Sequence, residues 1–260
     1  NYTDSLGYPM EIEVSTLKSH AIIAEYENDG IPNQSWSIYS SLVGSIVLDG
    51  GLYAINEGKW YRVDQQFKQN IEDQFQVLIT QWDQPPLPFR TEISENGGRQ
   101  SYQTELSYNQ ETAERNGWIC LDQRLIALED VARSRFELCD LIDIENKRLI
   151  HVKRSSRKSS ILSHFFKQGS NSAQQFKMIP ACADSLREEL LANEGAAAAQ
   201  MLDASLASED PWTIEFWIAD RPRQNGEHNI PFFSKISLRD EYRRLRGMEF
   251  RVLIRFITLP

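Results

Sequence analysis

The chain has 260 residues and a formal net charge of −9 at neutral pH. This length permits one α/β domain with an added lobe or two smaller domains, so the size of the core is not limiting. The negative charge argues against a protein that coats nucleic acid without specificity, because such binding needs an excess of lysine and arginine. A nucleic-acid-binding surface on this chain must therefore be local.

The cysteines and the hydropathy limit the setting of the protein. Cys120, Cys139 and Cys182 are an odd number at wide spacing, which fits neither a disulfide framework nor a zinc cluster. No apolar run approaches the roughly 20 residues of a transmembrane helix, and the N-terminus lacks a charged segment followed by an apolar one. We expect a cytoplasmic protein with no membrane partner. Because the chain begins with Asn1, a fragment, a processed product or part of something longer all stay open.

The first third of the chain predicts a small antiparallel sheet. Turn signals separate short β-rich runs at residues 21–26, 37–48, 52–55 and 60–63. Asn56 and Gly58 tolerate positive φ, which favours a hairpin at residues 56–59. An amphipathic helix capped by Asp64 is expected over residues 64–81, where apolar residues recur at helical spacing.

A polar loop at residues 95–100 with Gly97-Gly98 indicates a boundary. We therefore expect an N-terminal β-rich region with one helix over residues 1–95 and an α/β domain over residues 96–260. The second domain should open with a short helix at residues 106–114.

Later elements follow in a regular order. Strands at residues 136–142 and 149–152 bracket a polar turn, which is typical of an antiparallel hairpin. A helix over residues 159–167 should stop at Gly169, and another should span residues 184–191. Residues 195–199 fit either a helix or a linker. The end of the chain predicts a β-α-β element, with its parts at residues 213–218, 237–246 and 250–257.

The predicted hairpin carries the residues that point most directly to chemistry. His151 and Lys153 alternate along the second strand and so share a face, while Asp140 lies across the turn. A carboxylate can hold a hard cation such as Mg²⁺, and a nearby lysine can orient or help to deprotonate an attacking water. The register that would bring Asp140 to the same face is not fixed by the sequence, and a surface hairpin without catalytic function stays an open alternative.

The hairpin resembles the PD-(D/E)XK nuclease superfamily, in which an acidic residue on one strand precedes an acid-x-Lys triplet on the next, followed by a helix. Here Asp140 precedes His151-Val152-Lys153, and a predicted helix follows. The resemblance implies a restriction-endonuclease-like mixed sheet flanked by helices, after the N-terminal antiparallel β region. His151 departs from the pattern, because it stands where that superfamily usually has an acid and is a poorer ligand for Mg²⁺.

The same resemblance implies a further acid on a helix. Glu105 is the first choice for it, ahead of Glu111 and Glu114. Glu137 precedes Asp140 by three residues and is expected to face the opposite side of a regular strand. The expected ligands of Mg²⁺ or Mn²⁺ are therefore Asp140 and Glu105.

The remaining candidate residues lie on and after the second strand. Gln168 resembles a glutamine that some members of the superfamily use near the scissile phosphate, so it joins His151 and Lys153 among the expected catalytic residues. A basic strip with interleaved serines, which begins at Lys147 and Arg148, could contact phosphates. The residues expected to bind nucleic acid are Arg154, Arg157, Lys158, Ser159, Ser160 and Lys167.

A longer resemblance covers most of the chain. The segments that carry it include Asp49-Gly50-Gly51-Leu52-Tyr53, Glu57-Gly58-Lys59-Trp60-Tyr61, Cys139-Asp140-Leu141, Leu162-Ser163-His164-Phe165-Phe166-Lys167-Gln168-Gly169 and Pro231-Phe232-Phe233-Ser234-Lys235. They are similar to the C-terminal half of a sporadically distributed, uncharacterised bacterial protein family. Patchy distribution suits defence against phage or plasmids, and the commonly longer members imply an N-terminal segment or a partner protein absent from this chain.

Together these patterns predict a metal-dependent nucleic-acid phosphodiesterase, with DNA as the expected substrate. The alternative is a catalytically inactive binding or sensor module of nuclease-like fold, because His151 removes a carboxylate. A scaffold or toxin-like component with a protein partner is a third reading, and a homo-oligomer is compatible with all three. The aromatic pairs Trp60-Tyr61 and Phe232-Phe233 are expected in the core rather than stacked on bases, and His164 is expected to pack rather than to bind a ligand.

Overall fold

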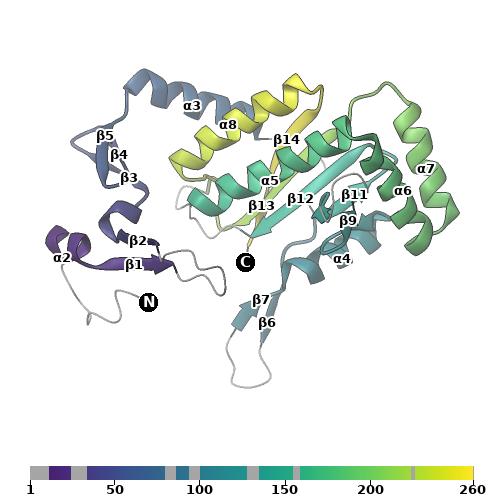
Figure 1. Ribbon diagram of the computed structural model, residues 1–260, viewed down its shortest axis with the longest axis horizontal. Helices are drawn as coiled ribbons and strands as arrows, with labels where there is room; N and C mark the ends of the chain where they lie inside the picture. Colours follow the sequence, from purple (N-terminus) through teal and green to yellow (C-terminus); the bar gives the residue numbers. More distant parts are fainter. Residues whose placement is uncertain are drawn as a thin grey trace. The chain divides into compact units, whose positions relative to one another are not determined.

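A computed structural model describes the chain over residues 12–24, 34–79, 86–93, 100–127, 135–154, 159–223 and 226–259 (Figure 1). The protein divides into two compact units, Asn1–Asn70 and Ile71–Pro260. The boundary expected between residues 95 and 96 falls within the second unit, at residues outside the described ranges.

The first unit contains short helices and antiparallel strands. They are α2 (Val14–Ser19), β1 (Ala21–Ala24), β2 (Gln34–Ser37), the 3₁₀ turn η1 (Tyr39–Ser41), β3 (Gly44–Leu48), β4 (Gly51–Asn56) and β5 (Lys59–Arg62). Strand β1 pairs with β2, and β4 pairs with both β3 and β5. The expected antiparallel region is therefore confirmed.

Local interactions explain two turns in this unit. The strand expected over residues 37–48 is broken at η1, because Ser40 N–H donates to Ser37 Oγ over 3.1 Å and bends the chain. The expected hairpin between β4 and β5 is present, with positive φ at Glu57 (50°) and Gly58 (70°).

Trp60 and Tyr61 in β5 are 47% and 52% exposed, so the prediction that they lie in the core is wrong.

Helix α3 (Gln65–Leu78) begins after Asp64, as expected. The Asp64 carboxylate caps the helix by accepting a 2.8 Å hydrogen bond from the Phe67 N–H. The apolar positions Ile71, Phe75 and Leu78 are buried. The 3.6-residue period of the sequence therefore located both the helix and its buried face.

The second unit is built around a mixed sheet. Its strands are β8 (Ile119–Cys120), β11 (Leu141–Asp143), β12 (Arg148–Arg154), β13 (Thr213–Asp220) and β14 (Arg251–Thr258). They run in the order β14-β13-β12-β11-β8. The pairs β8–β11 and β11–β12 are antiparallel, whereas β12–β13 and β13–β14 are parallel. The predicted hairpin is present, with Leu141 opposite Ile150.

Helices cover both faces of this sheet (Figure 1). Their bounds are α4 (Glu105–Asn116), α5 (Ser159–Met178), α6 (Pro180–Asn193), α7 (Ala196–Ala207) and α8 (Phe232–Gly247). Helices α5 and α8 pack side by side, and they bury Phe166 and Leu238 against the sheet residues Leu149 and Phe216. On the other face, Tyr108 of α4 belongs to a separate core cluster with the sheet residues Ile150, Val152 and Trp217. The terminal β-α-β element is β13–α8–β14, as predicted.

Helix α5 runs through Gly169, where a stop had been expected. That prediction is wrong because this glycine is needed for packing. A Cβ at this position would lie 2.5 Å from Cε1 of Phe216 and 3.1 Å from Cδ2 of His151. The missing side chain therefore lets α5 lie close to β12 and β13.

The strand expected over residues 136–142 is two strands. Strand β10 (Arg135–Glu137) pairs with β9 (Leu125–Ala127), whereas β11 begins only at Leu141 and pairs with β8 and β12. The residues between β10 and β11 leave the strand conformation, so the chain changes sheets there. A further short pair, β6 (Thr91–Ile93) and β7 (Gln100–Tyr102), precedes α4.

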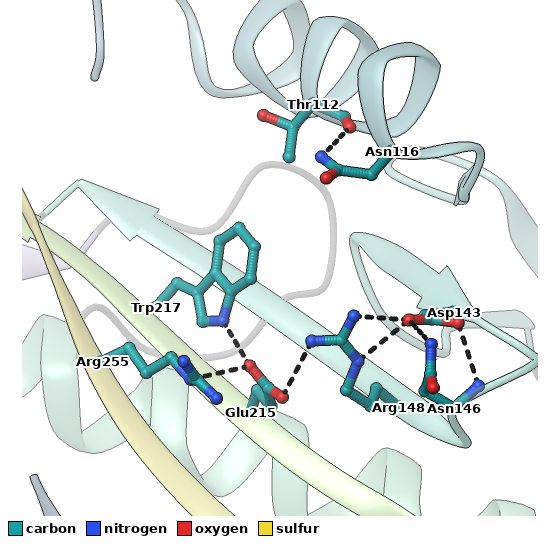
Figure 2. A network of polar contacts seen from close by, with 8 residues as sticks. All are labelled: Thr112, Asn116, Asp143, Asn146, Arg148, Glu215, Trp217 and Arg255. Atoms are coloured by element: carbon teal, nitrogen blue, oxygen red, sulfur yellow. Dashed lines mark hydrogen bonds and ion pairs between the residues drawn. The ribbon is translucent and has the colours of Figure 1, made fainter. Parts of the chain in front are cut away.

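A buried ionic network ties the central strands together on the face that α4 covers (Figure 2). Glu215 of β13 is fully buried and accepts a 2.8 Å hydrogen bond from Nε1 of Trp217. It also pairs with Arg148 of β12 over 3.4 Å and with Arg255 of β14 over 3.3 Å. Arg148 in turn contacts Asp143, which holds the hairpin turn through Asn146. The network therefore links four neighbouring strands of the sheet, β11, β12, β13 and β14.

Candidate active site

A polar pocket of about 110 Å³ lies where the hairpin meets α4 and α5. It collects side chains from elements that are far apart in the sequence. Its lining residues are Glu105, Asp122, Glu137, Cys139, Asp140, His151, Val152, Lys153, Phe165 and Gln168. All five residues expected to be catalytic therefore line one pocket, although their catalytic role remains a prediction.

Asp140 is held by main-chain hydrogen bonds on both sides. Its N–H donates to the carbonyl of Ile150 over 3.0 Å, and its carbonyl accepts from the N–H groups of Leu121 and Asp122 over 2.8 and 3.1 Å. Its Oδ2 accepts a 2.6 Å hydrogen bond from the Val152 N–H. The backbone of β12 therefore fixes both the position and the direction of this carboxylate.

Three carboxylates meet at this point. One oxygen from each of Asp122, Glu137 and Asp140 lies within 4.8 Å of the other two. The expectation that Glu137 faces away from Asp140 is wrong, because alternation holds only within a regular strand and β10 ends at Glu137. The break before β11 turns both side chains to the same place.

Burial and mutual repulsion make this cluster costly to ionise. Burial raises the pKa of Asp140 well above its usual value, and nearby Asp122 and Glu137 raise it further against the effect of the Val152 N–H. Burial also raises the pKa of Glu137, which the Gln123 N–H and Lys153 partly oppose. A divalent cation would relieve this repulsion, and carboxylate oxygens are the ligands that Mg²⁺ and Mn²⁺ prefer.

Lys153 is paired with Glu105 in the pocket, and both side chains are partly exposed. Its Nζ lies 2.8 Å from Oε2 of Glu105, and Oε1 of the same carboxylate accepts a 2.9 Å hydrogen bond from the Arg154 N–H. Thr104 caps α4 by accepting from the Ser107 N–H, which fixes the helix end that carries Glu105. Glu105 therefore positions Lys153, whereas Asp122 and Glu137 are the acids that join Asp140. The expected role of Glu105 as a metal ligand stays a prediction.

His151 lies against the hydrophobic core. It is 4% exposed, and its ring stacks on Phe216 with 5.6 Å between centroids. Burial lowers its pKa to about 4, so the ring is neutral near pH 7. Its Nε2 is buried and has no hydrogen-bond partner among the described residues. His151 lines the pocket but lies outside the group of three carboxylates.

The basic strip does not form one continuous surface. Lys147 is buried, and its Nζ donates to the carbonyls of Ser208 and Asp210, both over 2.9 Å. Arg148 belongs to the buried ionic network. These two cations therefore stabilise the fold and are not available to phosphates.

The other residues expected to bind nucleic acid have different surroundings. Arg154 is exposed and lies over the ring of Tyr102. Ser159 contacts Ser234 of α8 through its carbonyl and hydroxyl, whereas Ser160 and Lys167 are exposed. Arg157 and Lys158 lie outside the described residues.

Sequence reasoning missed Asp122 and Glu137 as members of the acidic cluster. Asp122 ends the run Trp118-Ile119-Cys120-Leu121-Asp122, in which an acid follows a short apolar segment as Asp140 does. That similarity could have indicated Asp122 as a second acid of the site. No comparable sequence signal indicated Glu137, because only the break between β10 and β11 turns it toward Asp140.

The fold and the pocket define an α/β protein with a mixed sheet and a carboxylate-rich site beside its central hairpin. The chain belongs to DUF6119, a family of unknown function, whose family model matches residues 1–258. This confirms the expectation of an uncharacterised family. Comparisons with curated proteins and with solved structures gave no match. Within the described ranges, no helix is both long and apolar enough to cross a membrane.

Proposed function

We propose that this protein is a divalent-metal-dependent phosphodiesterase that cuts nucleic acid, with DNA as its expected substrate. The observation that carries the proposal is the meeting of Asp140 and Lys153 in one pocket with two further carboxylates. Acids that can hold a cation and a lysine that can act on a water or a phosphate are the groups that this hydrolysis needs.

The order of elements also supports the proposal. Helix α4 precedes the antiparallel strands β8, β11 and β12, and α5 then leads by way of α6 and α7 to β13, which is parallel to β12. Asp140 immediately precedes β11, His151-Val152-Lys153 lies in β12, and Glu105 begins α4. This order is similar to the one that the resemblance to PD-(D/E)XK nucleases implies, except that Asp140 lies just before its strand and not within it.

The donor set fits a hard divalent cation. Asp122, Glu137 and Asp140 would hold Mg²⁺ or Mn²⁺, because they supply three carboxylate groups whose charges repel one another without a cation. When bound, the ion supplies a Lewis acid for the phosphate and lowers the pKa of a coordinated water. Lys153, held by Glu105, would orient this water or neutralise charge on the phosphate.

His151 bears on the alternative of an inactive binding or sensor module. His151 is neutral and stands where the PD-(D/E)XK pattern has a second metal-binding carboxylate. If catalysis requires a carboxylate at this position, the protein is inactive. Asp122 and Glu137 offset the missing charge from other elements, and for this reason we favour the enzyme. Defence against phage or plasmid DNA is the biological setting that we propose, on the expectation that the resembled family is patchily distributed.

Incubation with single-stranded and duplex nucleic acid, in Mg²⁺ or Mn²⁺ and then in EDTA, tests the proposal. Asp140→Asn and Lys153→Ala should each lower the cleavage rate by about 100-fold or more, the scale expected for groups that act on the reacting atoms. Glu188→Gln is the matched control, because Glu188 is exposed on α6 away from the pocket. Undiminished cleavage by Lys153→Ala contradicts the proposal. Binding without turnover supports the inactive module.

A further inference from the structure

A second and larger cavity adjoins the candidate active site. Its volume is about 620 Å³, within the range of roughly 300–1,000 Å³ that is usual for small-molecule sites. It shares Glu137 and Gln168 with the smaller pocket, so the two spaces are neighbours. Its lining residues are Leu125, Phe136, Glu137, His164, Lys167, Gln168, Asn171, Ser172 and Gln175.

One face of α5 forms the polar wall of this cavity. His164, Gln168, Asn171 and Gln175 follow at intervals of four, three and four residues, which places them along one side of the helix. The exposed Lys167 adds a cation beside Gln168. Three members of this stripe, Gln168, Asn171 and Gln175, carry amides, and Gln168 also lines the carboxylate pocket.

The amides of Asn171 and Gln175 have different hydrogen-bonding states. Oδ1 of Asn171 accepts a 2.8 Å hydrogen bond from Nη1 of Arg244, which leaves the Asn171 amide nitrogen to act as a donor. Oε1 of Gln175 is buried and has no hydrogen-bond partner in the described structure. A buried acceptor of this kind is costly unless a water or a ligand completes it. Gln175 lines the cavity, so a rotation of its amide would turn the unpaired oxygen toward a ligand, one turn from the Asn171 donor.

The β9–β10 pair contributes two apolar side chains to the lining, Leu125 and Phe136, beside the carboxylate of Glu137. Phe136 is half-buried and packs on one side against the hydrophobic core, while it lines the cavity on another. Leu125 is 55% exposed beside it. An anchored aromatic ring is a suitable surface for a flat aromatic ligand, because every nucleobase can stack on it.

We propose that this cavity binds one unpaired nucleobase of the substrate while the adjoining phosphodiester lies in the carboxylate pocket. The inference rests on the proposed function and adds the class of substrate. A nucleobase has a flat apolar face for Phe136 and adjacent donors and acceptors for the amides of α5. Because a paired base is stacked and its pairing edge is occupied, the substrate must be single-stranded or have a flipped base. Lys167 lines the cavity next to Gln168, which both spaces share, and would contact the phosphate backbone of the bound strand.

Binding to a short single-stranded oligonucleotide and to the duplex of the same sequence tests this, with EDTA present so that no cleavage occurs. Fluorescence anisotropy should show at least tenfold tighter binding to the single strand. Gln175→Leu and Phe136→Leu should each weaken single-strand binding by about tenfold, a typical effect for a lost base contact or stack. Gln200→Leu, at an exposed position of α7, is the matched control and should have no effect.

The outcomes separate this inference from the proposed function. Equal affinity for single strand and duplex, or unchanged single-strand affinity of a folded Gln175→Leu, overturns the base site. If these variants weaken binding but no metal supports cleavage, the base site stands and the phosphodiesterase fails. If cleavage depends on Lys153 while Gln175→Leu binds normally, the reverse holds. Melting curves show whether each variant is folded. Phe136 packs on the core, so Phe136→Leu can unfold the protein, and in that case Gln175→Leu decides the test.

Discussion

The Val152 N–H donates a 2.6 Å hydrogen bond to Oδ2 of Asp140, across the antiparallel pair that β11 and β12 form. The donor lies directly beside Lys153, so one strand both aims the carboxylate and carries the cation of the pocket. Among the described residues, no side chain of opposite charge bonds to the Asp140 carboxylate. Its high pKa reflects this arrangement, because burial outweighs the single hydrogen bond.

Glu137→Gln should reduce the response of the protein to divalent cations. The change keeps the size of the side chain and removes one charge from the cluster with Asp122 and Asp140. Mn²⁺ added to EDTA-treated protein should raise the melting temperature of the wild type more than that of the variant, since a ligand that binds the folded state stabilises it. Glu145→Gln, at an exposed position of the hairpin turn, is the control. Equal shifts in the wild type and Glu137→Gln would contradict a metal role for Glu137.

Gly169→Ala should destabilise the protein by about 1–3 kcal/mol, the usual cost of an overpacked core. The added methyl group would lie 2.5 Å from the buried ring of Phe216, which has no room to move away. Gly247→Ala in α8 is the control, because a Cβ there has no neighbour within 4 Å. Urea unfolding of the two variants should give free energies that change in opposite directions, since alanine favours a helix. A neutral Gly169→Ala would mean that α5 can move away from the sheet.

Glu215→Gln should cost about 3–5 kcal/mol of unfolding free energy, because it leaves Arg148 and Arg255 beside a buried neutral group (Figure 2). The comparison is Asp203→Asn, which breaks an ion pair with Arg187 whose side chains are 46–47% exposed. Exposed pairs of this kind contribute little to stability, because water and salt screen them. Urea titrations at neutral pH measure both. If the two variants lost similar amounts of unfolding free energy, burial would not increase the contribution of the Glu215 ion pairs to stability.

Much of the fold followed from local sequence patterns. The hairpin of β11 and β12, helix α3 with its Asp64 cap and the terminal β13–α8–β14 element were predicted because turn chemistry and apolar periodicity act over a few residues. The same patterns led to Asp140 and Lys153, which the structure brings into one pocket with Glu105 and Gln168.

The features that sequence patterns missed depend on contacts between distant elements. A glycine after an apolar helical pattern is typical of a helix end, but Gly169 lies inside α5. It is a glycine because the ring of Phe216 from β13 leaves no room for a side chain there. The break between β10 and β11 arises because one segment pairs with β9 and the next with β8 and β12. This long-range choice places Glu137 beside Asp140, and no alternation rule within a single strand could have predicted it.

His151 should make stability fall in acid. Its pKa in the folded protein is lowered to about 4 from 6.5, because burial disfavours the charged ring. Between these two pH values the unfolded chain binds more protons than the folded protein, so the free energy of unfolding decreases as the pH falls through this window. At about 1.4 kcal/mol for each pKa unit, the total loss of unfolding free energy is of order 3 kcal/mol.

His151→Gln removes this titration and should flatten the pH dependence of the unfolding free energy between pH 6.5 and 4. His164→Gln, which alters an exposed ring on α5, should keep the wild-type slope. Chemical unfolding at a series of pH values measures both slopes, and an unchanged slope for His151→Gln would mean that the buried ring accepts a proton without unfolding the core.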